Sequence, residues 1–176
     1  MSHQLAAGVT LVLGGARSGK SRFAEKLVEA SGHVTVYVAT GQSLDDEMAA
    51  RIAAHQARRD ANWRTVEAPF DLAGAIANED GEGRVLLVDC LTLWLSNLMM
   101  RDADIGAETA RLAGELAAAR APVVLVSNEV GLGIVPDNAM ARAYRDHAGQ
   151  LNQRIARLAQ SVYFVAAGLP LVLKKE

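Results

Sequence analysis

The chain has 176 residues, of which 51% are hydrophobic and 22% charged, and its formal net charge is −2. This length and composition predict one globular domain spanning residues 1–176. The near-neutral charge excludes a general electrostatic attraction to nucleic acid or acidic lipid, so neither is an expected partner.

Strand and helix patterns alternate along the chain. The apolar runs 85–89 and 123–126 are continuous, as in strands that are buried on both faces of a parallel sheet. The predicted strands are residues 9–13, 34–38, 63–67, 85–89, 123–126, 162–166 and 169–173. The predicted helices follow residue 21 up to Gly32 and then cover 43–59, 71–78, 91–100, 105–120 and 138–160. This alternation predicts a three-layer α/β fold with a mostly parallel sheet and a short antiparallel C-terminal edge.

Residues 14–21 read Gly-Gly-Ala-Arg-Ser-Gly-Lys-Ser and lie between a predicted strand and a predicted helix. This context is the one that a P-loop requires, and it argues against a glycine-rich turn that matches by accident. Backbone N–H groups of such a turn, with the start of the helix, bind phosphate. We expect Lys20 to reach the β- and γ-phosphates and Ser21 to bind Mg²⁺. The predicted fold is therefore the RecA-like form of the P-loop NTPase fold, with phosphate-contacting residues Gly14, Gly15, Ala16, Arg17, Ser18, Gly19, Lys20 and Ser21.

Asp89 ends the buried apolar run 85–89. A carboxylate at the end of such a strand can hold Mg²⁺ beside Lys20 and Ser21. The alternative is that Asp89 caps the helix that begins near Cys90, and the two roles do not exclude each other.

His55 separates the possible functions. Its helical spacing from Met48 and Ile52 favours, by itself, a packed or partly exposed histidine. The neighbouring Arg58 and Arg59 favour a functional role, because nearby guanidinium groups lower the pKa of an imidazole toward its neutral, nucleophilic form. A neutral imidazole can attack phosphorus and divide a nucleotidyl transfer into two steps.

Other polar and aromatic residues carry weaker signals. Glu67 and Glu129 lie at or after predicted strand ends, where open α/β sheets bind ligands, but a surface salt bridge explains each equally well. Trp63 and Trp94 are expected in the core or at an interface. Cys90 is expected to be a small buried residue rather than a nucleophile.

The expected compartment is the cytoplasm. Cys90 is the sole cysteine, so an internal disulfide is excluded and a reducing environment is compatible. Residues 1–8 lack the pattern of a signal peptide, and the apolar stretch 85–100 is interrupted by Asp89 and Asn97, so no membrane span is expected.

Several blocks of the sequence together resemble one family, the bifunctional adenosylcobinamide kinase/adenosylcobinamide-phosphate guanylyltransferases. The resemblance covers nearly the whole chain, and its most specific parts are the block around His55 and the Ser-Asn-Glu-Val-Gly block. The resembling blocks are 14–22, 37–40, 45–52 with His55 and Arg59, 63–67, 89–92 with Asn97 and Leu98, 127–136 and 152–154.

The resemblance implies two reactions on one corrinoid substrate. ATP or GTP first phosphorylates adenosylcobinamide, and the histidine matching His55 then takes GMP from GTP and passes it to the new phosphate, giving adenosylcobinamide-GDP. It also implies a homotrimer, a need for Mg²⁺, and catalytic roles for His55 and Lys20. Besides the P-loop, the implied GTP contacts are Ala39, Thr40, Gly41, Gln56, Ala57, Arg58, Arg59, Glu67 and Asp89.

The residues leave two rival functions open. A small-molecule P-loop kinase would transfer the γ-phosphoryl group without forming a nucleotidylated protein, and His55 would then be structural. A non-catalytic nucleotide-binding module would show no turnover with a corrinoid.

Overall fold

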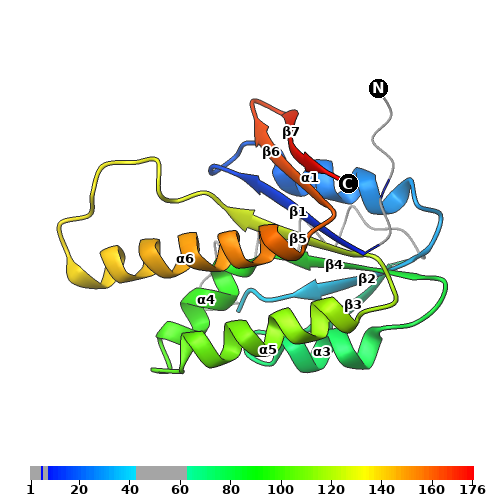
Figure 1. Cartoon of the computed structure of the whole chain (residues 1–176), viewed down its shortest axis with the longest axis horizontal. Coiled ribbons are helices and arrows are strands. Elements are labelled where there is room, and N and C mark those ends of the chain that lie inside the picture. Colours follow the sequence, from blue (N-terminus) through cyan, green and yellow to red (C-terminus); the bar gives the residue numbers. More distant parts are fainter. Residues whose placement is uncertain (1–4, 6–7, 43–62) are drawn as a thin grey trace.

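The computed structural model describes residues 5, 8–42 and 63–176. The predicted helix 43–59 lies outside these residues. The described elements alternate as expected and keep the labels of Figure 1. They are β1 (Val9–Gly14), α1 (Lys20–Glu29), β2 (Val34–Ala39), β3 (Trp63–Glu67), α3 (Leu72–Glu79), β4 (Arg84–Asp89), α4 (Leu91–Met99), α5 (Ile105–Ala118), β5 (Val123–Asn128), α6 (Ala139–Leu158), β6 (Ser161–Ala166) and β7 (Leu169–Lys175).

All seven strands join one sheet in the order β3-β2-β4-β5-β1-β6-β7. Every neighbouring pair is parallel except β6 and β7, which form an antiparallel hairpin at one edge. The predicted mostly parallel sheet with an antiparallel C-terminal edge is therefore confirmed. The strand order, which the sequence leaves undetermined, puts only β5 between β1 and β4.

Helices cover both faces of the sheet, so the structure has three layers (Figure 1). On one face, α1 packs Ala24, Leu27 and Val28 against β-strand residues such as Val126. On the other face, α3, α4, α5 and α6 enclose a larger core that includes the fully buried Trp94. The central strands are apolar on both faces because both faces are covered.

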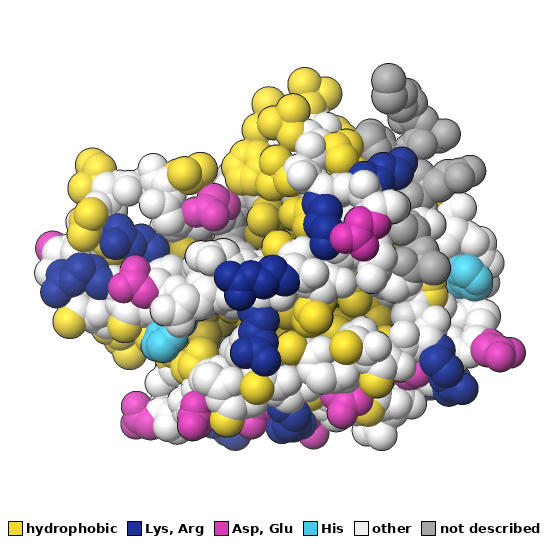
Figure 2. Space-filling view, viewed as in Figure 1, with side chains coloured by type: hydrophobic (Ala, Val, Ile, Leu, Met, Phe, Trp, Pro, Cys, Tyr) yellow, Lys and Arg dark blue, Asp and Glu magenta, His cyan; other side chains and the backbone are white. Residues whose placement is uncertain are grey.

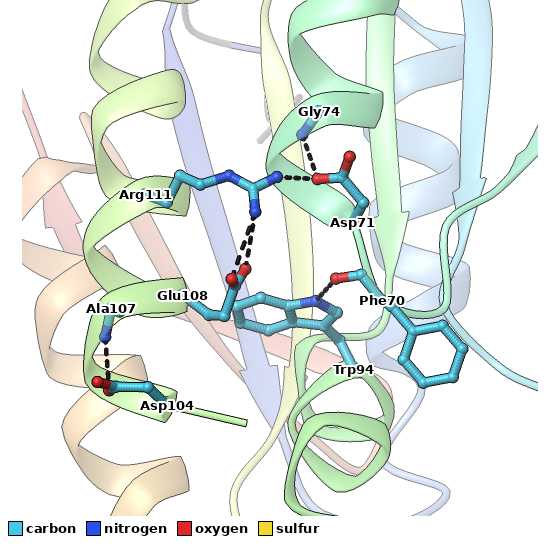
Figure 3. A network of polar contacts seen from close by, with 8 residues as sticks. All are labelled: Phe70, Asp71, Gly74, Trp94, Asp104, Ala107, Glu108 and Arg111. Atoms are coloured by element: carbon cyan, nitrogen blue, oxygen red, sulfur yellow. Dashed lines mark hydrogen bonds and ion pairs between the residues drawn. The ribbon is translucent and has the colours of Figure 1, made fainter. Parts of the chain in front are cut away.

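Side-chain caps start three of the helices. Asp71, Asp104 and Asn138 each accept a hydrogen bond from the backbone N–H three residues further on, at 3.0, 2.9 and 2.8 Å. Figure 3 shows that Asp71 also pairs with Arg111 of α5, so the start of α3 is tied to its neighbouring helix. Among the described residues, no helix is long and apolar enough to cross a bilayer.

Candidate nucleotide site

The phosphate-binding motif lies between β1 and α1, where the sequence predicts it. Its backbone conformation explains two of its glycines. A Cβ atom on Gly14 would lie 2.6 Å from the carbonyl oxygen of Val165, and Gly19 has a φ of 94° in the left-handed region. Arg17 also has a positive φ, of 55°. The loop can therefore turn sharply into the first turn of α1, whose N–H groups bind anions in this arrangement.

Lys20 lies against the loop that precedes it. The residue is 8% exposed, and its ammonium group donates a hydrogen bond of 3.0 Å to the carbonyl oxygen of Gly15. A Cβ atom on Gly15 would meet nothing within 4 Å, so the loop has open space at this point. The positive charge therefore sits beside a loop that is open at Gly15.

Neighbouring segments hold the loop from two sides. The N–H of Glu129, just after β5, donates to the carbonyl oxygen of Gly14 at 3.0 Å. The N–H of Gly168, in the turn between β6 and β7, donates to the carbonyl oxygen of Ser18 at 2.8 Å. These backbone contacts fix the loop through atoms that do not compete for a bound phosphate.

Three of the predicted site residues are the last residues of neighbouring strands and pair in register. Ala39, Glu67 and Asp89 end β2, β3 and β4, and Ala39 pairs in register with each of the other two. The loop after β1 lies at the same edge, about 10 Å from β4, because two strand spacings separate the strands. The structure therefore brings the P-loop, Ala39, Glu67 and Asp89 to the carboxyl end of the parallel strands.

The charges of Lys20 and Asp89 both influence the pKa of the Cys90 thiol. Burial raises the pKa of the Cys90 thiol, the Asp89 carboxylate raises it further, and the Lys20 ammonium group lowers it in part. Both charges thus act on the same buried sulfur. The expectation that Cys90 is a small buried residue is confirmed by its 5% exposure, and a raised pKa disfavours the thiolate form that a nucleophile needs.

Asp89 does not cap the following helix. Cys90 occupies the cap position of α4, and no side chain there accepts a capping hydrogen bond. The Asp89 carboxylate instead accepts a hydrogen bond from the hydroxyl of Tyr37 at 3.3 Å. The capping alternative is therefore wrong.

The donor set suits a magnesium ion. The Ser21 hydroxyl and the Asp89 carboxylate offer hard oxygen ligands, and Mg²⁺ commonly takes one or two protein ligands together with substrate phosphates. The described residues contain no cluster of three or more His, Cys, Asp or Glu side chains that could hold a metal ion.

Several predicted residues need separate comment. His55, Gln56, Ala57, Arg58 and Arg59 lie outside the described residues. Gly41 is partly exposed beyond the end of β2. Thr40 is fully buried, and its hydroxyl contacts the backbone of Cys90 on the inside of the protein.

Glu129 and the tryptophans can also be placed. The Glu129 carboxylate accepts a hydrogen bond from the N–H of Gly131, and no salt bridge to it is found within the described part of the chain. Trp94 is in the core, and its indole N–H donates to the carbonyl oxygen of Phe70 at 2.8 Å (Figure 3). Trp63 is partly exposed and packs near Tyr37.

Sequence reasoning missed two residues at this edge. Both lie in blocks that carry the family resemblance, but neither was given a role: Tyr37 reads as a strand residue, and Asn97 of α4 interrupts an apolar run. A further signal for Asn97 was that a polar residue inside an otherwise apolar helix needs a hydrogen-bond partner. For Asn97 the partners are the carbonyl oxygens of Thr40 and Pro69, at 2.8 and 2.9 Å.

Solved structures with the same arrangement define the class. The chain is similar to the RadB recombinase, with a TM-score of 0.55 and 16% identity over 91% of this chain and 75% of that one. It is also similar to the flagellar accessory protein FlaH from Methanocaldococcus jannaschii, with a TM-score of 0.57 and 12% identity over 98% of this chain and 80% of that one. The fold and the motif define a RecA-like P-loop NTPase fold.

The sequence comparisons give the family within this class. Residues 10–173 match the family described as cobinamide kinase / cobinamide phosphate guanyltransferase. The chain is 50% identical over 173 residues to the bifunctional adenosylcobalamin biosynthesis protein CobP of Pseudomonas aeruginosa, covering 94% of this chain and 97% of the relative. It is 43% identical over 179 residues to CobU of Escherichia coli, covering 93% and 98%. This chain belongs to the cobinamide kinase / cobinamide phosphate guanyltransferase family.

Proposed function

We propose that this protein is a bifunctional enzyme of cobalamin biosynthesis, which phosphorylates adenosylcobinamide and then transfers GMP to the product. The observation that carries the proposal is the full-length family match, combined with a P-loop and a strand-end carboxylate at one edge of the sheet. We further propose that residues 1–176 act as one nucleotide-binding domain, for which the single seven-stranded sheet is the support.

In the kinase step, the protein's own groups bind and neutralise the triphosphate of ATP or GTP. Backbone N–H groups of residues 14–21 surround the phosphates, and the Lys20 ammonium group turns from Gly15 toward the γ-phosphate. Mg²⁺ held by Ser21 and Asp89 would neutralise further negative charge and orient the phosphates. The corrinoid hydroxyl then forms the new O–P bond, the bond between the γ-phosphorus and the bridging oxygen breaks, and the nucleoside diphosphate leaves.

In the second step, the imidazole of His55 acts as the nucleophile. It forms an N–P bond with the α-phosphorus of GTP while pyrophosphate leaves. The phosphate of adenosylcobinamide phosphate then displaces the histidine and takes the GMP group. Ala39, Gly41 and Glu67 at the strand ends and Gln56, Ala57, Arg58 and Arg59 beside His55 are proposed to bind the nucleotide.

The test is to look for guanylylated protein. Purified protein is incubated with Mg²⁺ and GTP labelled at the α-phosphorus, denatured, and examined for label that is acid-labile and base-stable. We expect such label on the wild type and on a His147→Ala control, but none on His55→Ala. Wild-type protein that binds GTP but takes no label would overturn the histidine mechanism.

A parallel assay separates this enzyme from the rival functions. ATP labelled at the γ-phosphorus is supplied with adenosylcobinamide, and label on the corrinoid is measured. Corrinoid phosphorylation without protein guanylylation would leave a small-molecule kinase. The absence of both reactions would leave a nucleotide-binding module.

We also propose that the protein is a cytoplasmic homotrimer. Support for assembly comes from apolar side chains on the edge strand β7, where four residues are 49–70% exposed, and Figure 2 shows this apolar region over the hairpin. These residues are Leu169, Leu171, Val172 and Leu173. Light scattering should give three times the chain mass of 18.7 kDa, and Leu171→Glu should lower it. A monomer mass for the wild type would contradict the proposal.

A further inference from the structure

Two buried side chains join the three chain segments that leave the carboxyl ends of β2, β3 and β4. The first is Thr40, which directly follows β2 and has no exposed surface. Its hydroxyl donates to the carbonyl oxygen of Cys90 at 2.7 Å and accepts from the N–H of Cys90 at 2.8 Å. A single hydroxyl thus ties the end of β2 to both polar groups of the residue after Asp89.

The second is Asn97, which reaches the same place from α4. It is 7% exposed, and its side-chain amide donates to the carbonyl oxygens of Thr40 and Pro69 at 2.8 and 2.9 Å. Thr40 follows β2 and Pro69 follows β3, so one amide spans both strand ends. An amide has two N–H donors, and this geometry uses one for each segment.

We propose that Thr40 and Asn97 are positioning residues that set where the Asp89 carboxylate stands relative to the P-loop. The inference rests on the proposed function, because it assigns Asp89 to the Mg²⁺-nucleotide. Asp89 is held through its backbone, since its carbonyl oxygen accepts from the N–H of Thr40 at 3.4 Å and its neighbour Cys90 is fixed by the Thr40 hydroxyl. Both side chains are neutral and their hydrogen bonds go to backbone groups, so we assign them a positioning rather than a catalytic role. Loss of the Thr40 hydroxyl or the Asn97 amide should weaken Mg²⁺-nucleotide binding more than it disturbs the rest of the fold, because the central strands keep their own hydrogen bonds.

The test compares three substitutions at this position of the fold with a matched control on the same helix. Asn97→Ala removes both donors, Thr40→Val removes the hydroxyl, and Thr40→Ser keeps it. The control is Trp94→Phe, because Trp94 is also buried on α4 and also donates one hydrogen bond to a carbonyl oxygen after β3, that of Phe70. A structural role alone would affect Asn97 and Trp94 variants in the same way.

The main measurement is the Mg²⁺ concentration that gives half-maximal binding of a fluorescent GTP analogue to the full chain, without any corrinoid. Groups that hydrogen-bond a metal-binding side chain change metal affinity by roughly 10- to 100-fold. Thr40 and Asn97 act on Asp89 only through the backbone, so we expect an increase at the lower limit, about 10-fold, for Asn97→Ala and Thr40→Val. Thr40→Ser and Trp94→Phe should both bind as the wild type does. Urea unfolding of all four variants shows whether each is folded and how much stability it has lost.

Two outcomes would overturn the inference. One is that Asn97→Ala and Thr40→Val lose stability as Trp94→Phe does but keep the wild-type Mg²⁺ dependence. The other is that Thr40→Ser, which keeps the hydroxyl, shifts the Mg²⁺ dependence as much as Thr40→Val. If Asn97→Ala does not fold, the comparison of Thr40→Ser with Thr40→Val decides alone. Failure of the guanylylation assay would leave this binding measurement unaffected, so the two proposals can fail separately.

Discussion

The two ends of the parallel sheet are both closed by buried polar side chains, but their chemistry differs. At the amino ends of β3 and β4, Glu79 is 6% exposed, and its carboxylate pairs with Arg64 at 2.8 Å and with Arg84 at 3.2 Å. At the carboxyl ends of β2 and β4, the groups that join the strands are the neutral side chains of Thr40 and Asn97.

Because of this difference, the amino end of the sheet contributes to stability, whereas the carboxyl end is suited to ligand binding. Charges at the amino end neutralise one another, so that end is satisfied without a ligand. The neutral hydroxyl and amide at the carboxyl end hold the backbone and add no charge beside Lys20 and Asp89. Among the described residues, the charges of Lys20, Asp89 and Glu67 and the start of α1 set the electrostatic field at that end, which suits a charged ligand.

The largest expected effect is on turnover, from Lys20→Ala. Removing a cation that stabilises developing phosphate charge should slow both reactions by about 10²- to 10³-fold. The measurement is turnover with labelled nucleotide, normalised to folded protein. The matched control is Arg84→Ala at the amino end, which should lose stability and keep its turnover. Equal losses of turnover in both variants would remove the distinction between the two ends.

The next effect is on stability, from Glu79→Ala. The substitution leaves Arg64 and Arg84 without their shared carboxylate, and because both arginines are partly exposed we expect a loss of about 1–3 kcal/mol in the free energy of unfolding. Urea denaturation measures it. Glu79→Gln should lose less, since its carbonyl oxygen still accepts a hydrogen bond. An unchanged midpoint for Glu79→Ala would show that these pairs contribute nothing.

Asp80 gives this end of the sheet a pH dependence. Burial raises the pKa of its carboxyl group, but hydrogen bonds from the N–H groups of Ala121 and Arg120 and the Arg120 guanidinium outweigh burial and lower the pKa below its ordinary 3.8. A lowered pKa in the folded state means stability that is present above pH 3.8 and lost as the pH falls through the folded-state value.

The corresponding variant is Asp80→Ala, for which we expect a loss of about 1 kcal/mol at neutral pH from the missing hydrogen bonds. Unfolding curves of the wild type and variant, recorded from pH 7 downward, should converge below pH 3.8. Turnover at neutral pH should not change. A stability difference that stays constant down to acidic pH would contradict the assignment to the ionised carboxylate.

The amount that could be predicted from the sequence differs between backbone and side chains. The P-loop, the alternation of elements and Asp89 at a strand end are local patterns, and each follows from a few adjacent residues. The antiparallel pairing of β6 and β7 was equally predictable, because Gly168 marks a short turn between two strands.

The arrangement around Asn97 was not predictable in this way. Its two partners, Thr40 and Pro69, are 57 and 28 residues away, and the contact exists only because β2, β3 and β4 are neighbours in the sheet. The two hydrogen bonds between the Thr40 hydroxyl and the backbone of Cys90 were unpredictable for the same reason, because they link β2 to the neighbouring strand β4. The order of the strands in the sheet, rather than the type of each residue, determined which contacts could not be predicted from the sequence.

The smallest expected effect is a gain in stability from Ala167→Asn, in the turn that supports the P-loop. Ala167 and Gly168 have φ values of 51° and 77°, and a two-residue hairpin turn with two positive φ angles prefers Asn-Gly. Alanine pays a steric cost in this region, so asparagine should raise the free energy of unfolding by about 0.5–1 kcal/mol. Ala167→Val should lower it, because a branched side chain tolerates a positive φ poorly. Thermal unfolding of both variants measures the two changes in stability, and equal stabilities would show that this turn relaxes freely.

The same turn also contacts the P-loop, because the N–H of Gly168 donates a hydrogen bond to the carbonyl oxygen of Ser18. A more rigid turn in Ala167→Asn should therefore leave the affinity for GTP unchanged or slightly higher. A weaker affinity would mean that the loop must move away from the hairpin to bind phosphate.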